Sequence, residues 1–295
     1  MKPLVSIYIT TYNRRPLLQR AIDSVLAQTH EEIELIVVDD YSTDDTREYL
    51  LEVAANQPQV KVDLKESNTG ACVSRNRAIR VARGQFVTGL DDDDFILPNH
   101  VTQLLSKHEA VSSRSTLPVA IFPEIAARRG SRLRSLKQPG GAVGLRQLKQ
   151  RNVVGNQVFA EKECFEIAGS FNEKLPAWQD YDLWIRMALK GVTFFKADGP
   201  TYIYEDDPSI IKISAGRHEK ILDSYNIVAS NPDLALTHIE RLRLKINYHR
   251  YRQAPMTLDD ALEYFRAGLV WLPVETIIKK RVANALHGLS AKRLT

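Results

Sequence analysis

Residues 85–98 of the chain read QFVTGLDDDDFILP and join two contrasting kinds of sequence. The first six residues are mostly apolar and predict a buried strand, whereas residues 91–94 are four consecutive aspartates. Adjacent carboxylates repel one another and are costly to desolvate, so they are stable together only where water or a cation reaches them. The stretch therefore indicates either a solvated acidic loop or a cation-binding site at the end of a core strand.

The residues before this stretch alternate between short apolar runs and segments with helical spacing. The apolar runs are nearly continuous, which is typical of a parallel sheet that is covered on both faces. We therefore predict a doubly wound, mostly parallel α/β fold over roughly residues 1–110. The expected strands are 4–10, 33–38, 60–64 and 85–90, and the expected helices are 16–28, 44–55 and 71–82. Beyond this part, strands are expected at 117–125 and 156–160.

Ligands of such sheets bind beyond the carboxyl ends of the strands. The polar residues that follow the four expected strands are Thr10 and Tyr12, Asp39 and Asp40, Asn68, and Asp91–Asp94. The first strand is followed by no GxGxxG, and no GxxxxGK[ST] occurs in the chain, which excludes a dinucleotide-binding fingerprint and a P-loop. A nucleotide at this edge would therefore be held in another way.

The composition is that of a folded protein with room for one large α/β domain and an appendage. Of the 295 residues, 44% are hydrophobic and 26% are charged, which is typical of a globular protein and argues against global disorder. The two cysteines, Cys72 and Cys164, form no CxxC pair, so neither a disulfide framework nor a zinc site is expected. The chain opens on an expected strand and its apolar runs are far shorter than the ~20 residues of a membrane span. We expect a cytoplasmic protein, attached at most to the inner face of the plasma membrane.

The net charge of +4 is unevenly distributed along the chain. Residues 209–295 hold 14 Lys and Arg against 8 Asp and Glu. Within this part, residues 240–252 interleave basic with apolar side chains, and helices are expected from Thr257 and from Pro273. One interpretation is a helical surface that meets anionic phospholipid or a lipid-linked acceptor, and the other is helix packing on the preceding domain. Nucleic acid is not an expected partner, because no known reader motif accompanies the charge.

Several segments together resemble the inverting glycosyltransferases of family 2, which have the GT-A fold. Beside the opening stretch they are VSIYITTYNR (5–14), ELIVVDDYSTDDT (34–46), NTGACVSRNRAI (68–79) and QDYDLWIRMALKG (179–191). The resemblance covers roughly residues 3–205. It implies transfer of one sugar from a nucleotide-diphosphate sugar, most often UDP-linked, to the hydroxyl of a glycan or lipid-linked glycan. We expect bacterial polysaccharide or lipopolysaccharide assembly as the setting.

The resemblance also implies a division of the chain. Residues 1–215 would form the GT-A domain, with a nucleotide-sugar-binding half (1–110) and an acceptor half (111–215). Residues 216–295 fall outside the resemblance, and their own pattern predicts a basic, helical C-terminal extension. Processive synthases of this superfamily carry QxxRW and membrane spans, and this chain shows neither, which favours the addition of a single sugar.

By resemblance the acidic run is the family's DxD element, which binds Mn²⁺ or Mg²⁺ through carboxylate oxygens. Such a cation neutralises the diphosphate leaving group. The matching positions make Asp93 the direct metal ligand and give Asp91 or Asp92 the ribose or a metal-bound water. Asp94 either takes part or only begins the next turn. The solvated acidic loop stays as the alternative.

The resemblance places the nucleotide over the first three strands. It assigns Asp40 to the imide of uracil, Thr10 and Tyr12 to the base pocket, and Arg75 to the base or diphosphate, with Asn68 close by. Tyr12 would stack on the base, although packing alone also explains a tyrosine there. The alternative for the paired aspartates is a local role at the start of the helix that Ser42 is predicted to cap.

The catalytic base of the resembling family is a carboxylate before a helix reading xDLWxR, and Asp180 matches it. It would remove the proton of the acceptor hydroxyl. Gln179 stands where the family has Glu, which leaves the role of that first carboxylate in doubt. Asp182 lies in the first helical turn, where a structural role is expected. Two other classes stay open: a nucleotidyltransferase, which should show a Gly/Lys-rich phosphate loop, and a non-catalytic nucleotide-sugar-binding homologue, which should lack Asp180.

Overall fold

The computed structural model describes residues 2–207, 218–249 and 256–269. They belong to two compact units. The first contains Met1–Leu148, Asn152–Leu175 and Gln179–Lys212, and the second contains Lys149–Arg151, Pro176–Trp178 and Ile213–Thr295. The domain boundary expected at residue 215 lies outside the described residues.

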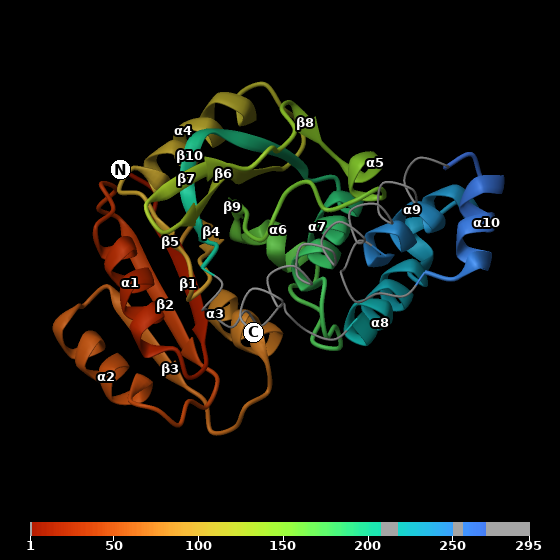
Figure 1. The fold of residues 1–295 in the computed structure, drawn as a ribbon. Helices are drawn as coiled ribbons and strands as arrows, with labels where there is room; N and C mark the ends of the chain where they lie inside the picture. The colour runs from red at the N-terminus through yellow and green to blue at the C-terminus, as the bar shows by residue number, and fades with distance from the viewer. Residues whose placement is uncertain (1, 208–217, 250–255, 270–295) are drawn as a thin grey trace. The chain divides into compact units, whose positions relative to one another are not determined.

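The first unit is built on one ten-stranded sheet, whose main path has the order β3-β2-β1-β4-β9-β6-β10-β5. Its first part is parallel, as the apolar runs predict, since β1 pairs with β2 and β4, and β2 pairs with β3, all in parallel register (Figure 1). The mixed α/β fold class is thereby confirmed. The strands of this part are β1 (Val5–Thr11), β2 (Ile33–Asp39), β3 (Val60–Leu64) and β4 (Phe86–Gly89).

The second part of the sheet is mixed, because β9 is antiparallel to both β4 and β6. Two reversals restore the direction, so β6 and the parallel β10 run the same way as β4. The carboxyl ends of β1 to β4, β6 and β10 therefore meet at one edge. The remaining strands are β5 (Phe95–Ile96), β6 (Val119–Arg129), β7 (Arg132–Ser135), β8 (Ala142–Val143), β9 (Phe159–Glu161) and β10 (Thr193–Glu205).

Helices cover both faces of the parallel part. On α1 the apolar positions Leu18 and Ile22 are fully buried and join the core cluster of Val5 and Ile7. The helix α3 also contacts β1 and β2 but lies on the other side of β1 (Figure 1). The helices of the unit are α1 (Arg15–Leu26), α2 (Thr46–Asn56), α3 (Ala71–Val81), α4 (His100–Ser112), α5 (Leu145–Leu148), α6 (Lys162–Ile167) and α7 (Gln179–Leu189).

The predicted cap of the second helix is wrong. The α2 helix begins at Thr46, and its N-cap residue Asp45 makes no capping hydrogen bond through its side chain. The hydroxyl of Ser42 instead accepts a hydrogen bond of 2.9 Å from the backbone N–H of Asn13. Ser42 therefore joins the loop after β2 to the loop after β1.

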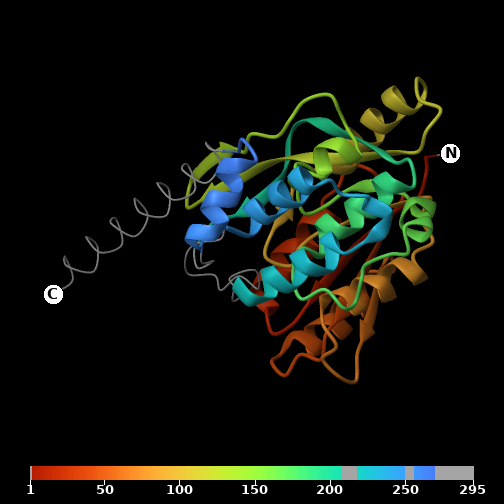
Figure 2. The ribbon, with the colours of Figure 1, turned by 90° about the vertical axis from the view of Figure 1, so that its right-hand side faces the viewer.

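The second unit contains α8 (His218–Ala229), a 3-10 helix (Pro232–Leu234), α9 (His238–His249) and α10 (Leu258–Arg266), which Figure 2 shows from another side. Thr257 caps α10 as predicted, through a capping box with Asp260. Leu242 and Ile246 of α9 pack with Tyr264 of α10. The helix expected from Pro273 lies outside the described residues. Among the described helices, none is both long and apolar enough to cross a membrane.

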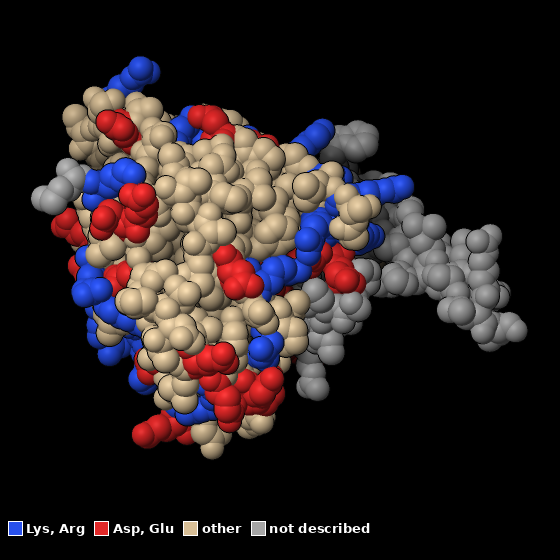
Figure 3. Space-filling view, turned by 90° about the vertical axis from the view of Figure 1, so that its left-hand side faces the viewer, with Lys and Arg blue, Asp and Glu red and all other residues tan. Residues whose placement is uncertain are grey.

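Figure 3 shows one face of the molecule, where acidic and basic side chains are interspersed around a largely uncharged area. Charge therefore singles out no partner for this face.

Candidate active site

Asp91 is held from the side of β9. Its carboxylate accepts hydrogen bonds from Asn156 Nδ2 (2.7 Å) and Gln157 Nε2 (3.0 Å). This approach requires a glycine in β4, because a Cβ at Gly89 would lie 2.1 Å from Gln157 Oε1. The same Oε1 accepts a hydrogen bond of 3.3 Å from the hydroxyl of Tyr8. Asp91 is thus fixed in place by the segment just before β9, and Gln157 of that segment is itself held by Tyr8 of β1.

Asp94 is tied to β10. Its Oδ2 accepts a hydrogen bond of 2.8 Å from the hydroxyl of Tyr202, and its Oδ1 accepts one of 2.9 Å from the backbone N–H of Glu205. Burial and the charges of Asp91 and Asp93 raise the pKa of Asp94 well above its usual range. A residue that only begins a solvated turn does not fit these contacts, because the carboxyl group of Asp94 is hydrogen-bonded to β10 at the edge of the sheet.

Asp92 and Asp93 share one cation, the guanidinium of Arg14. Arg14 NH1 lies 3.0 Å from Asp92 Oδ1 and 3.2 Å from Asp93 Oδ2. Asp92 is buried, and its pKa is raised to about 6 by that burial, which the charge of Arg14 opposes. Part of the mutual repulsion in the acidic run is therefore relieved by the loop after β1.

The donor set fits a divalent cation. Asp91, Asp93 and Asp94 each offer one carboxylate oxygen, and these atoms all lie within 4.8 Å of one another. Carboxylate oxygens are the ligands that Mg²⁺ and Mn²⁺ prefer. Within the described chain, Asp93 Oδ1 has no hydrogen-bond partner, whereas both oxygens of Asp91 and of Asp94 accept one. Asp92, by contrast, is not in this cluster and faces Arg14.

Arg75, on α3, joins the acidic run to the segment expected to supply the base. Its NH1 donates to Gln179 Oε1 (2.8 Å) and lies 3.5 Å from Asp180 Oδ1, while its NH2 lies 3.5 Å from Asp91 Oδ1. The guanidinium also stands over the ring of Phe171. Gln179, the departure from the family pattern, is thus a neutral acceptor for Arg75. Its Nε2 donates to the carbonyl of Leu175 at 3.1 Å.

Asp180 has the environment of a general base. Its pKa is raised to about 7, chiefly by burial, with Arg75 lowering it and Asp91 raising it. The side chain is 25% exposed, and its Oδ1 is buried without a hydrogen-bond partner in the described chain. A carboxylate with a pKa near neutrality is suited to accept a proton from a hydroxyl. Asp182, two residues on, is instead bound to Arg186 Nε at 2.8 Å.

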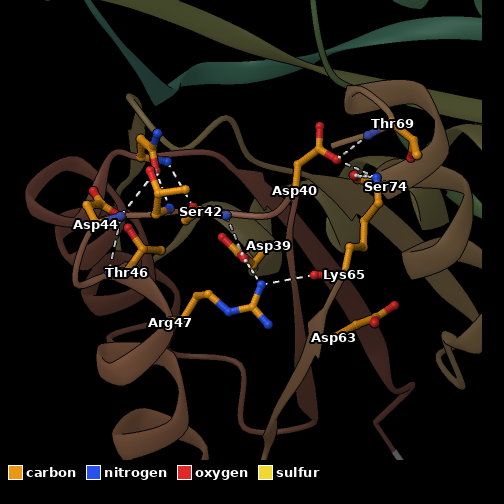
Figure 4. A network of polar contacts seen from close by, with 12 residues as sticks. Asp39, Asp40, Ser42, Asp44, Thr46, Arg47, Asp63, Lys65, Thr69 and Ser74 are labelled. Carbon is orange, nitrogen blue, oxygen red and sulfur yellow. Dashed lines mark hydrogen bonds and ion pairs between the residues drawn. The ribbon is translucent and has the colours of Figure 1, made fainter. Parts of the chain in front are cut away.

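Asp40 lies in a polar network at the ends of β2 and β3 (Figure 4). Its two oxygens accept hydrogen bonds from the backbone N–H groups of Thr69 (3.0 Å) and Gly70 (2.9 Å), at the start of α3. It also forms an ion pair with Lys65, whose side chain is only 3% exposed and donates to Ser74 Oγ at 3.0 Å. The carboxylate therefore binds the N-terminus of α3 and neutralises Lys65. One lone pair of its Oδ2 is left to accept a hydrogen bond from a ligand. Asp39 is bound separately, to the backbone N–H of Ser42 and to Arg47.

The other residues predicted to bind the nucleotide line the same edge. Thr10 is half-buried near the end of β1, and Tyr12 directly follows that strand with 41% of its surface exposed. Asn68 is exposed in the loop after β3. An exposed Tyr12 is available for stacking, so packing does not account for it. Binding by these residues stays a prediction.

Five side chains of the site were missed at the level of sequence: Arg14, Lys65, Asn156, Gln157 and Tyr202. Each contacts a residue of the acidic run or Asp40. Arg14 could have been found in the sequence, because this cation follows the first expected strand just as the aspartates follow the fourth. The polar pair Asn156-Gln157 lay inside an expected strand, where amides needed an explanation.

The fold is similar to that of solved GT-A glycosyltransferases. One is TarS of S. aureus (residues 1–349) in complex with UDP-GlcNAc, with a TM-score of 0.65 at 17% identity, covering 95% of this chain and 92% of that one. Another is the mannosyltransferase PcManGT of Pyrobaculum calidifontis with GDP-Man and Mn²⁺, with a TM-score of 0.56 at 15% identity, covering 95% and 87%. At these identities the likeness shows the fold alone.

The family follows from sequence. The model of glycosyl transferase family 2 matches residues 6–157, and the chain belongs to this family. It is 35% identical over 210 residues to the Escherichia coli (strain K12) protein named as the colanic acid biosynthesis glycosyl transferase WcaA, covering 68% of this chain and 72% of that protein. It is 43% identical over 93 residues to the Bacillus subtilis (strain 168) protein named for teichuronic acid biosynthesis, TuaG, covering 32% and 37%. The resemblance found in the sequence is thereby confirmed.

Proposed function

We propose that the protein is a metal-dependent, non-processive, inverting glycosyltransferase. It moves one sugar from a nucleotide-diphosphate sugar, preferably UDP-linked, to a hydroxyl group of a glycan or lipid-linked glycan. The names of the relatives, which refer to colanic and teichuronic acid biosynthesis, support polysaccharide assembly as the setting.

One observation carries the proposal: Arg75 contacts both Asp91 of the acidic run and Asp180, at 3.5 Å each. The group that would meet the donor and the group that would activate the acceptor thus belong to one site. This arrangement argues against a non-catalytic homologue, which has no need of a carboxylate with a raised pKa in this place.

Asp93, with Asp91 and Asp94, would hold the metal, and a divalent cation bound there supplies positive charge for the departing diphosphate. Asp180 accepts the proton of the acceptor hydroxyl while its oxygen bonds to the anomeric carbon and the bond to the diphosphate breaks. Arg75 orients Asp180 and keeps it beside the donor. The attack comes from the side opposite the leaving group, which inverts the anomeric centre.

The full-length protein with a panel of UDP-, GDP- and dTDP-sugars tests the proposal through nucleotide release, measured with Mn²⁺, with Mg²⁺ or with EDTA. We expect release from one donor, dependent on metal and lost in Asp93→Ala. Asp198→Ala is the matched control, because Asp198 pairs with Lys107 and its side chain is 84% exposed. Release that survives both EDTA and Asp93→Ala would refute the metal-dependent mechanism.

A further inference from the structure

The β6–β7 hairpin, residues 126–135, carries an unusual concentration of arginine. In its antiparallel register Arg129 is opposite Arg132, and Ala127 is opposite Arg134. Residues opposite one another share a face of the sheet, and successive residues alternate between faces. Arg129, Arg132 and Arg134 therefore stand on one face of the hairpin, which we call the arginine face.

The arginine face is not neutralised within the described chain. Arg129 pairs with Asp206 at 2.8 Å, yet its side chain is 67% exposed. Neither Arg132 nor Arg134 has a hydrogen bond or ion pair through its side chain to any described residue, and all four residues of β7 are exposed. Like charges directly opposite one another destabilise a hairpin. A local arrangement that opposes stability in this way is typical of a functional surface.

The other face of the hairpin is joined to the acidic run. Arg128 Nε donates to Glu205 Oε2 at 3.0 Å, and the backbone N–H of Glu205 donates to Asp94 at 2.9 Å. The hairpin is therefore braced against the same strand end that holds Asp94.

The hairpin extends past the acidic run along the strand direction and is separated in the sheet from β1, β2 and β3. Arg129 lies four residues beyond Ile125, which pairs with Tyr202 of the site, so it stands about 13 Å further along the strand direction. In the sheet order β6 is separated from β1, β2 and β3 by β4 and β9. The arginines of the hairpin are therefore distant from the first three strands, over which the nucleotide is predicted to bind. The acceptor is the substrate that they are expected to meet.

We propose that the arginine face binds a glycan acceptor that carries negative charge, as carboxylate or phosphate groups along its chain. This inference rests on the proposed function and adds the chemical class of the acceptor. Arginine forms bidentate hydrogen bonds with both kinds of anion. A membrane surface fits less well, because surface binding to lipid needs apolar side chains beside the cations, and Leu133 lies on the opposite face.

Binding of defined oligosaccharides to the full-length protein tests the inference. The probes are an oligogalacturonate (carboxylate), a glycerol-phosphate oligomer (phosphate), a neutral dextran oligomer and vesicles of phosphatidylglycerol. Calorimetry is carried out with the wild type and with Arg132→Gln/Arg134→Gln. The matched control is Arg114→Gln/Lys190→Gln, which removes two exposed charges before β6 and before β10, at the opposite edge of the sheet.

We expect one or both anionic oligomers to bind, the preferred one identifying the anion, and dextran not to bind. The hairpin double variant should weaken this binding about 2- to 30-fold, as expected for two exposed ion pairs, and salt should weaken it further. The control should bind like the wild type. Equal binding by both double variants, or binding of dextran as tight as that of the anions, would overturn the inference. A hairpin variant that loses only vesicle binding would overturn it in favour of a membrane contact.

Donor release in the same variants keeps the two proposals apart. If the hairpin variant releases nucleotide from the donor like the wild type but binds the anionic oligomer weakly, both proposals stand. If the wild type binds the oligomer but releases nucleotide from no donor in the panel, the proposed function fails and the anion surface stands.

Discussion

Replacing Asp180 by asparagine removes the basicity of the proposed base while it preserves the shape of the side chain. Asp180 Oδ1 makes no hydrogen bond in the described chain, so the change breaks none at that atom. Arg75 keeps its hydrogen bond of 2.8 Å to Gln179 and its contact with Asp91 at 3.5 Å. We therefore expect donor affinity to change by less than about threefold, and kcat to fall by about 10²–10⁴-fold, the usual contribution of a general base.

The pH profile gives the same test a second readout. The pKa of Asp180 is raised to about 7, and a carboxyl group acts as a base only when it has lost its proton. Turnover of the wild type should therefore rise as the pH increases through about 7 and then level off. Asp180→Asn should lack this rise. Turnover is measured with saturating donor and acceptor from about pH 5.5 to about pH 9.

Asp182→Asn is the control, because it makes the same chemical change two residues away on α7. Asp182 is bound to Arg186 at 2.8 Å, so its loss should lower the melting temperature and leave the pH profile intact. Near-wild-type turnover in Asp180→Asn, with the rise near pH 7 preserved, would refute the assignment. Collapse of turnover in Asp182→Asn alone would transfer the role to Asp182.

Four other outcomes are expected. Asp93→Ala should weaken UDP binding only when Mn²⁺ is present, which calorimetry with and without the metal measures. UDP binding that is unaffected by both the substitution and the metal would contradict the role of Asp93 as a metal ligand. Asp40→Asn should lower UDP affinity by about 1–3 kcal/mol if the carboxylate pairs with uracil. The substitution also leaves the buried Lys65 without its anionic partner, which could destabilise the fold. The double variant Asp40→Asn/Lys65→Met removes that buried charge as well, so it separates a loss of UDP affinity from misfolding. Unchanged UDP affinity in both variants would show that Asp40 is not part of the nucleotide pocket. Burial alone would raise the pKa of Glu34, but hydrogen bonds from its neighbours lower it to about 2, below the ordinary 4.5. Glu34→Gln should therefore destabilise the fold at neutral pH, by an amount that shrinks as the pH falls from 4.5 towards 2 in thermal melts, and a constant difference would contradict this. If residues 240–293 touch an anionic membrane, co-sedimentation of the full chain with vesicles should rise with anionic lipid and fall with salt. No dependence on lipid charge would leave that segment a packing role.

The structure qualifies the basic character of the C-terminal segment. Of the cations on α9, Arg241 donates to the carbonyl of Ala229, and Lys245 pairs with Asp260 at 2.6 Å. Two of the charges counted from the sequence are thus used inside the second unit. Residues 250–255 and 270–293 of the segment lie outside the described residues.

The parallel half of the sheet was predictable because its signals are local. Each strand there is a short apolar run, and its polar loop follows at once in the sequence. Asp91–Asp94 could be placed at the sheet edge for the same reason. Even Asp40, which the sequence placed at the end of β2, lies at that edge.

The partners of these residues were not predictable, because they come from distant parts of the chain. Tyr202 binds Asp94 across 108 residues, and no local pattern connects them. The expected strand at 156–160 begins only at Phe159, since Asn156 and Gln157 turn towards Asp91 instead of joining the ladder. Lys65 directly follows β3, where a lysine is usually solvated. Its ion pair with Asp40, which comes from the end of another strand, explains why it is buried.

The sheet order has a consequence for how the protein folds during synthesis. The pairs among β1, β2, β3 and β4 join residues within the first 89 of the chain, so this part can form as soon as it leaves the ribosome. The strands β9 and β10 arrive only after a further 70 and 104 residues, respectively, counted from Gly89 to Phe159 and to Thr193. The aspartates are therefore translated early but receive Gln157, Tyr202 and the backbone of Glu205 late. A nascent chain would already have its parallel strands while its metal-binding residues were still without their supports, so the ability to bind a donor should be gained in one late step rather than by degrees.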